Sequence, residues 1–357
     1  MRFRHRLPFA LVLVGMVAAC SDGGGSSAPT DAVQDTLEIS TLPSVVETAP
    51  AATTTTLPAT TTTEVPPLLH ALTGLPVEGD GLVVFRPAIV AKVGNYDAHP
   101  AHGVNVADIV FEEIINDNVS RFAMVFQSQG AELVGPIRSG RIQDVDLLGS
   151  FNSPILAWSG GNGTVTREID NSDLINMSPN FCKSACFRVD FDKAPYNLFF
   201  NIDVAWLQAP PGAGSPSPQF VYRSPDVVAP GAPSAGVAVQ MDSYEIDWTW
   251  NSTSGLYERQ QNGRADNDGD GELTTTNNVV VLEMDYLPGV SNSPDAQSVG
   301  TGTAWVFSAG NMMKGTWTRA DRTQPFTLTA DDGTPMVLTP GRTFVELPRT
   351  GGNVTPK

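Results

Sequence analysis

Residues 108–127 read DIVFEEIINDNVSRFAMVFQ, and this stretch decides which fold the chain can form. It holds two runs rich in Ile, Val and Phe, at 108–115 and 121–127, separated by Asn and Asp, which is typical of β-strands. Runs of the same kind lie at 88–93 and 154–158. We therefore expect four strands in this part of the chain.

Between the third and the fourth of these runs along the chain, apolar residues are spaced as in a helix. Apolar residues recur at Ile142, Val145, Leu148 and Phe151, which predicts a helix within residues 138–151. Residues 164–174 and 201–207 are weaker helix candidates. Strands interleaved with helices predict a mixed α/β domain over residues 67–230.

The pattern changes after residue 207. Pro and Gly interrupt residues 208–236 repeatedly, which indicates a connection between domains. Beyond it, short strand-like runs and turns continue to Leu347 with almost no helical spacing. This predicts a smaller, mostly antiparallel β domain over 231–349 and a tail at 350–357, so the expected fold class is α+β.

The first 66 residues resemble a targeting and tethering region. Arg2 and Arg4 precede a short apolar run, Leu7–Val17, and Val17-Ala-Ala-Cys20 matches a lipobox. We expect residues 1–20 to be a lipoprotein signal peptide with a lipid on Cys20; an ordinary signal peptide with an incidental Cys is the alternative. The Thr- and Pro-rich residues 21–66 predict a disordered stalk. The mature protein is then anchored to the outer face of the cell membrane.

Composition restricts the partners and the cysteine chemistry. The 357-residue chain has a formal net charge of −17, which argues against nucleic-acid partners. No run outside the leader approaches the ~18 apolar residues that could cross a bilayer. Besides Cys20 the chain has Cys182 and Cys186. In an oxidising compartment we expect a disulfide between them, with two free thiols as the alternative.

Gly135-Pro-Ile-Arg-Ser-Gly-Arg141 is the sharpest candidate for a binding site. Gly and Pro set a turn, Ser139 is expected to cap the following helix, and Arg138 and Arg141 add fork-shaped donors beside a helix N-terminus. Together with Arg121 they suit a carboxylate or a phosphate. The alternative is a structural network in which these arginines pair with acidic residues, namely Asp144, Asp146, Glu112 and Glu113.

Further polar residues are predicted to line the same cleft. Asn95, Asp108 and Glu112 would form one wall, and Asp144 lies in the first turn of the expected helix. Glu112 and Glu113 alternate faces on a strand, so only one of them can point at a given site. A hydrolase would need two such carboxyl groups placed across the bond that it cleaves.

Asp266, Asp268 and Asp270 stand at alternate positions before Gly271, as in the first half of an EF-hand-type calcium loop. The twelfth position is Asn277 instead of a bidentate Glu, so we expect weak calcium binding at most, and no other cofactor. An acidic hairpin turn is the alternative.

Several motifs in order carry a resemblance to a known family. In the first region they are Leu72-Thr-Gly-Leu-Pro76, Val106-Ala-Asp-Ile-Val-Phe-Glu112, Gly135–Arg141 and Ala194-Pro-Tyr-Asn-Leu198. In the second they are Asn277–Val281, Gly300–Ala304, Gly315–Arg319 and Leu338–Gly341. On these motifs the chain resembles the YerB-like lipoproteins, which have an uncharacterised N-terminal domain and a β-rich C-terminal domain.

The resemblance implies a cell-envelope lipoprotein of undetermined biochemical role. The family pattern has His where this chain has Tyr196, and His before the Gly-Gly where this chain has Trp158-Ser159. Acid–base chemistry that depends on either His would be absent here. We therefore favour a non-catalytic protein that binds an anionic small molecule, a cell-wall component or an envelope protein. The second hypothesis is a hydrolase of cell-wall or glycan substrates that uses Asp108, Glu112 or Asp144.

Overall fold

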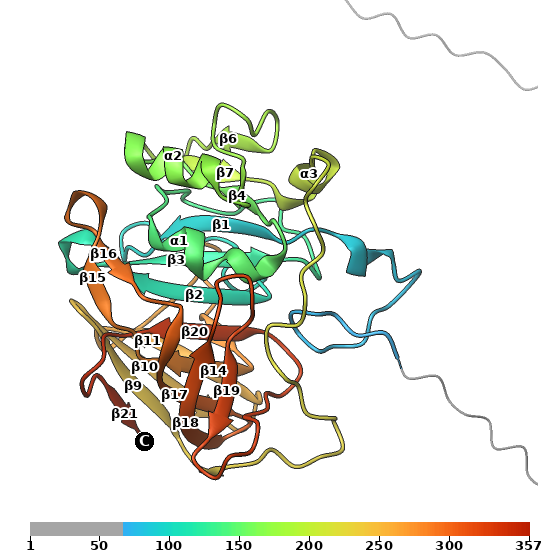
Figure 1. Ribbon diagram of the computed structural model, residues 1–357, viewed down its shortest axis with the longest axis vertical. Helices are drawn as coiled ribbons and strands as arrows, with labels where there is room; N and C mark the ends of the chain where they lie inside the picture. Colours follow the sequence, from blue (N-terminus) through green and yellow to red (C-terminus); the bar gives the residue numbers. More distant parts are fainter. Residues whose placement is uncertain (1–66) are drawn as a thin grey trace, which may run out of the picture. The chain divides into compact units, whose positions relative to one another are not determined.

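The apolar runs of the sequence become the strands of a large sheet in the computed structural model, which describes residues 67–357 (Figure 1). Its strands are β1 (Ile89–Gly94), β2 (Ile109–Ile114), β3 (Ser120–Phe126), β4 (Ile155–Ala157), β5 (Ile175–Asn176), β8 (Ala232–Pro233), β14 (Asn278–Leu282), β17 (Gly300–Ser308), β18 (Asn311–Arg319), β19 (Thr327–Ala330) and β20 (Thr343–Leu347). Their order is β19-β18-β17-β14-β20-β2-β3-β1-β4-β5, with β8 paired to β18. The central strands are buried along their whole length, because both faces of the sheet are covered.

A second, antiparallel sheet packs on one face of the first. It contains β9 (Gly236–Met241), β10 (Tyr244–Asn251), β11 (Leu256–Gln261), β12 (Arg264–Ala265), β13 (Thr275–Thr276) and β21 (Val354–Pro356). β21 pairs with β9, so the residues expected to form a tail contain a strand. Two hairpins complete the strands: β6 (Cys186–Arg188) with β7 (Leu198–Phe200), and β15 (Tyr286–Pro288) with β16 (Pro294–Ala296).

Helices are few and short. They are α1 (Gln143–Leu147), α2 (Gly163–Asn171) and α3 (Ile202–Leu207), with 3-10 turns η1 (Leu82–Phe85), η2 (Asn116–Asn118), η3 (Gly149–Phe151) and η4 (Val290–Asn292). The helix predicted within 138–151 divides into α1 and η3, because Gly149 packs directly against Arg322 and Asn152 turns the chain at a φ of 60°. The described chain is thus mostly strand, and the expected α/β character of residues 67–230 is reduced to three short helices. None of the helices that the structure describes is long and apolar enough to span a membrane.

Two hydrophobic cores lie on the two faces of the large sheet. One fills the space between it and the second sheet, where Phe344 packs edge-on against Phe122 and lies 4.9 Å from the Trp248 ring. The other lies under α1, η3 and α2, where Phe111 meets Phe151. The protein is therefore a layered structure in which α1, η3 and α2 cover one face of the central sheet, and the second sheet and α3 cover the other.

The two regions that the sequence suggested as domains share this central sheet. β20, from the C-terminal region, lies between β2 and β14 and runs parallel to both. Its register with β2 pairs Phe111 with Val345 and Glu112 with Glu346. Hydrogen bonding therefore continues from one region into the other without interruption.

Candidate functional site

The segment Gly135–Arg141 is fixed between β1 and the loop that follows β4. The N–H of Arg138 donates to the carbonyl of Lys92 in β1 (2.8 Å). On the other side, the N–H of Ser159 donates to the carbonyl of Arg138 (3.0 Å). The segment therefore behaves as an extra strand-like layer at the end of β1, and its side chains are held in place by the sheet.

A hollow of about 290 Å³ opens between this segment and the loop at 158–162. Its wall combines hydroxyl groups, amides and one guanidinium with a few apolar side chains, and none of its described lining residues is Asp or Glu. They are Asn116, Ser139, Gly140, Arg141, Ile142, Ser159, Gly160, Gly161, Asn162, Val165, Val290, Ser291 and Ser293.

Arg121 and Arg141 converge at the carbonyl of Ser139. Arg121 donates to it from Nη1 (2.6 Å), and Arg141 donates from Nη2 to Oδ1 of Asn116 (2.7 Å). Arg121 is only 5% exposed, and the Nε atoms of both arginines are buried without a partner. Burial, followed by the charge of Arg141, lowers the pKa of Arg121 to about 10. Burial also lowers the pKa of Arg141.

Arg138 lies between two aromatic rings. Its guanidinium is 5.6 Å from the ring centre of Tyr96 and 5.0 Å from that of Tyr196. His99 stacks on Tyr196 at 3.7 Å, and its Nδ1 lies 2.6 Å from a carboxylate oxygen of Asp192. Tyr196 therefore stacks on His99 and lies beside the guanidinium of Arg138.

Among the described residues, Arg121, Arg138 and Arg141 form no salt bridge. Their guanidinium groups instead donate to backbone carbonyls, namely those of Ser139, Gly140 and Pro195, and to Asn116. Arg141 and Ser139 line the hollow, and Arg121 and Arg138 do not. The three like charges lie close together and repel one another, and the charge of Asp144 offsets part of this repulsion at Arg141.

The loop at 158–162 adds backbone donors to the hollow. In the part of the chain that the structure describes, the N–H groups of Gly160, Gly161 and Asn162 donate to no protein acceptor. The side chain of Asn162 accepts from the N–H groups of Thr164 and Val165, both at 3.0 Å, and so caps α2. The positive end of the α2 dipole therefore borders the hollow.

The predicted capping role of Ser139 is wrong. α1 begins at Gln143, and its start is closed by Asp144, whose carboxylate accepts from the N–H of Arg141 (2.7 Å). The hydroxyl of Ser139 instead lies 3.5 Å from that of Ser159 across the hollow. Ser139 is thus free to act as a donor or an acceptor toward a ligand.

A buried cluster of charged side chains lies next to the segment Gly135–Arg141. Lys92 on β1 contacts Glu113 on β2 and lies 2.9 Å from Asp144, and all three side chains are fully buried. Burial lowers the pKa of Lys92 to about 8, although the charge of Asp144 opposes this shift. Asp144 therefore belongs to this cluster and does not line the hollow.

Glu112 and Asn95 belong to a different network, between the two sheets. Glu112 pairs with Arg259 (2.6 Å), and Asn95 donates to Glu112 (3.0 Å) and to Gln261 (2.8 Å). Glu346 faces the same network, where burial and then the charge of Glu112 raise its pKa. The predicted polar wall formed with the arginines is thus not present, because Glu112 and Glu113 point to opposite faces of β2 as their alternation required.

Asp108 lies apart from the arginines as well. Its carboxylate accepts from the N–H groups of Gln127 (2.6 Å) and Ser128 (2.8 Å) at the end of β3. Burial raises its pKa to about 6. Asp108, Glu112 and Asp144, the residues considered for acid–base catalysis, are all at most 1% exposed and do not line the hollow.

The three aspartates of the predicted calcium loop point to different partners. Asp266 forms a salt bridge with Arg259 (2.5 Å), Asp268 accepts from Asn105 (2.9 Å), and Asp270 faces His102 (3.5 Å). Within residues 67–357, no group of His, Cys, Asp and Glu side chains is arranged to hold a metal ion.

The structure joins Cys182 to Cys186 in the disulfide that the sequence suggested. Cys20, the signal peptide and the stalk lie outside the described residues.

Sequence reasoning named Arg138, Ser139, Arg141 and Arg121 but missed much of the opposite wall. Asn116 and Ser291 come from turns far apart in the chain, and no local pattern marks them. The sequence did signal one side, since Gly160-Gly161-Asn162-Gly163 follows a strand and precedes a helix. Lys92 could also have been noticed, because a lysine inside a run of apolar strand residues needs a buried counter-charge.

The fold and the site define a mostly β protein whose two regions share one sheet and whose hollow is basic and free of carboxylates. Residues 72–210 match the N-terminal domain, and residues 237–345 the C-terminal domain, of the family described as protein of unknown function DUF3048. The chain belongs to this family, which includes the YerB-like proteins.

The chain is similar in sequence and in structure to YerB of Bacillus subtilis. YerB of Bacillus subtilis (strain 168), which is named as a candidate lipoprotein, is 26% identical over 289 residues, covering 77% of this chain and 85% of its own length. The crystal structure of YerB protein from Bacillus subtilis matches with a TM-score of 0.70 at 23% identity, covering 81% of this chain and 99% of the crystallised one. The second comparison shows a shared fold.

Proposed function

We propose that this chain is a lipid-anchored cell-envelope protein that binds a small anionic ligand in the hollow beside Arg141. The family description assigns no biochemical role, so the proposal rests on the site. The observation that carries it is the group formed by Arg121, Arg138 and Arg141, three neighbouring guanidinium groups that have no carboxylate partner among the described residues. The anchor is proposed from the lipobox at Cys20 and from the likeness to a candidate lipoprotein.

Energetics favour an anion at this place. Arg121 is buried and repelled by Arg141, which is why its pKa falls to about 10. A buried charge without a partner costs several kcal/mol, roughly, and an opposite charge within ~4–6 Å offsets that cost. A bound anion beside Arg141 would add a further negative charge to this group of three arginines.

The wall of the hollow fits a phosphate or carboxylate group. Arg141 provides a charged donor, Ser139 and Ser159 provide hydroxyl groups, and the unpaired N–H groups of Gly160 and Gly161 are the kind of donors that bind oxyanions at helix starts. The absence of Asp and Glu from the described lining removes the repulsion that an anion would otherwise meet. The small volume restricts the ligand to a small molecule or to the charged end of a larger one.

Thermal unfolding of the mature protein in phosphate, sulfate or citrate, at constant ionic strength, tests the proposal. The wild-type Tm should rise with anion concentration, by an amount that corresponds to ~2.7 kcal/mol when the anion reaches about 100 times its Kd. Arg141→Ala should abolish this rise while the protein still folds.

Lys314→Ala is the matched control, because Lys314 is an exposed cation on β18. It should leave the anion effect intact. A wild-type Tm that none of the three anions moves, or a rise that Arg141→Ala retains in full, would reject the proposal.

A further inference from the structure

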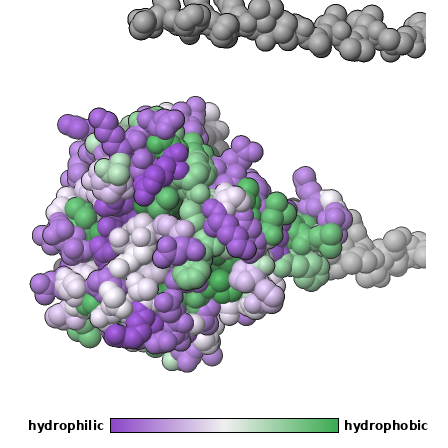
Figure 2. Space-filling view, turned by 90° about the horizontal axis from the view of Figure 1, so that it is seen from above, coloured by the Kyte–Doolittle hydropathy of each residue, from purple (hydrophilic) through white to green (hydrophobic). Residues whose placement is uncertain are grey.

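The first residues of the described chain form an arm that exposes large apolar side chains. Leu68, Leu75, Leu82 and Phe85 are exposed by 55%, 42%, 64% and 72%. In Figure 1 this arm is the blue segment that projects from the body, and in Figure 2 its hydrophobic residues form a green protrusion. Single exposed apolar residues are ordinary, but a cluster of them on a projection indicates a contact surface.

Where the arm returns to the body it forms the turn η1 (Figure 1), with the sequence Leu82-Val-Val-Phe85. None of its four residues is buried. Leu82 and Phe85 are exposed and Val83 and Val84 are half-buried, so this turn is more apolar than turns usually are. The turn begins after Gly81, whose φ of 75° suits glycine.

The arm is presented by a firmly packed base. Leu72 is fully buried, and its carbonyl accepts from the hydroxyl of Tyr222. Gln127, at the end of β3, donates to the carbonyl of Val83 in the turn (3.0 Å). Hydrogen bonds therefore fix both the start of the arm and η1 to the body, and the exposure of Leu82 and Phe85 does not result from a loosely attached segment.

We infer that this arm docks on the hydrocarbon surface of the membrane that carries the lipid anchor. The inference rests on the proposed anchor at Cys20. The chain between Cys20 and the body ends at Leu68, whose side chain lies 3.3 Å from the position where a Cβ on Gly81 would be. The tether therefore joins the body beside the apolar turn, and a chain of this length keeps a membrane within ~160 Å at full extension.

Charge decides the kind of membrane contact. The arm carries Glu78 and Asp80 beside its apolar residues, and the whole chain has a net charge of −17. Anionic headgroups would repel it, so attraction must come from burial of apolar area, about 25 cal/mol per Å². The contact should be stronger on zwitterionic vesicles than on anionic ones, and salt should not weaken it.

Hydrogen exchange on a chemically anchored protein tests this inference. The mature chain, with Cys182 and Cys186 joined, has one free thiol at Cys20, which couples to a maleimide lipid in phosphatidylcholine vesicles. Exchange at residues 81–87 should become several-fold slower than in the uncoupled protein mixed with the same vesicles. Residues of the β15–β16 hairpin, including exposed Leu287, should exchange as before.

Leu82→Ser combined with Phe85→Ser should remove the protection, and Leu287→Ser is the matched control that should keep it. Equal exchange at 81–87 in the coupled and uncoupled proteins would overturn the inference. Protection that increases with phosphatidylglycerol content would also overturn it, because it would indicate an electrostatic contact. Since the probe supplies the lipid, a failure here is distinct from a failure of native lipidation or of anion binding.

Discussion

Among single residues, Asp108 illustrates how a buried carboxyl group makes stability depend on pH. Its two backbone hydrogen bonds and its contact with Ser128 do not compensate for lost water, and its pKa rises from 3.8 to about 6. The folded protein therefore holds this proton more tightly than the unfolded chain. This contribution is complete below pH ~4 and is lost as the pH rises through about 6.

We predict that the free energy of unfolding falls by up to about 3 kcal/mol between pH 4 and pH 7 because of Asp108. Urea unfolding across this range, for wild type and Asp108→Asn, measures the effect. The variant should have a flatter pH profile, since its amide does not titrate. Asp226→Asn, at an exposed position, is the control. Identical profiles of unfolding free energy against pH for wild type and Asp108→Asn would contradict the prediction.

At the scale of elements, Lys92 connects β1, β2 and α1. Within the described chain, Lys92 is the only cation that forms a salt bridge with Glu113 or Asp144, and all three side chains are buried. Removing one member of a buried ion group leaves its partners uncompensated, which costs roughly 3–5 kcal/mol. Since Asp144 also fixes the N–H of Arg141, the loss should reach the hollow.

Lys92→Met is therefore expected to lower the free energy of unfolding by ~3–5 kcal/mol. Chemical denaturation at pH 7 measures this loss, and Lys314→Met, at an exposed lysine on β18, should change it little. Adding Glu113→Gln to Lys92→Met should recover part of the loss, because it removes one uncompensated charge. A Lys92→Met protein as stable as wild type would show that the cluster contributes nothing to the fold.

The strands were predictable because each is a short apolar run bounded by turn residues. The predicted runs 108–115 and 121–127 correspond to β2 and β3, and 343–347 corresponds to β20. The pairing of β2 with β20 was not predictable, because buried parallel strands carry the same apolar pattern whichever neighbour they have. For the same reason the boundary drawn at residue 230 could not reveal a shared sheet.

The site was predictable only where its residues are close in sequence. The segment Gly135–Arg141 was recognisable as a turn with two arginines. The structure adds Arg121, which donates to the carbonyl of Ser139 in this segment. The arginines could meet carboxylates only if a glutamate of β2 pointed toward them. Instead, Glu113 pairs with Lys92 and Glu112 pairs with Arg259. Such competition between distant charges is set by tertiary packing, which a single sequence does not display.

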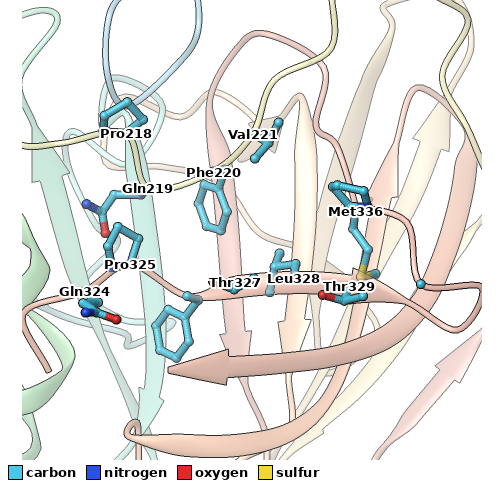
Figure 3. Close-up of a pocket in the computed structure, with 13 residues that line it drawn as sticks. Pro218, Gln219, Phe220, Val221, Gln324, Pro325, Thr327, Leu328, Thr329 and Met336 are labelled. Atoms are coloured by element: carbon cyan, nitrogen blue, oxygen red, sulfur yellow. The ribbon is translucent and has the colours of Figure 1, made fainter. Parts of the chain in front are cut away.

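Other surface features of the whole molecule are consistent with one folded body that has several hollows. A mainly apolar groove of about 480 Å³ lies between Phe220 and β19, with Pro325 and Met336 on its walls (Figure 3). Phe220, Phe326, Leu328 and Met336 are each at most 7% exposed, so they complete the core under the sheet edge. The groove thus shows residues 218–222, from the connecting segment, packed on the last strands of the C-terminal region.

For the molecule as a whole, the position of β20 predicts that the two regions fold together. If the C-terminal region were absent, β2 would become an open edge, with unpaired N–H and carbonyl groups along a fully buried strand. Glu112 would also lose its salt-bridge partner Arg259, which lies on β11 of the second sheet. Neither loss could be repaired by water without exposing the surrounding apolar side chains.

Residues 67–357 should therefore unfold in one calorimetric transition, with equal calorimetric and van't Hoff enthalpies, as expected of a single cooperative unit. A chain that ends at residue 236 should not reach a folded monomer, because it keeps β2 and β3 but lacks β20, β14 and β11. Differential scanning calorimetry of the first and NMR spectra of the second measure these outcomes. Two separate transitions, or a dispersed spectrum from the shortened chain, would mean that the shared sheet joins two independently stable domains, with the hollow beside Arg141 lined by residues of both.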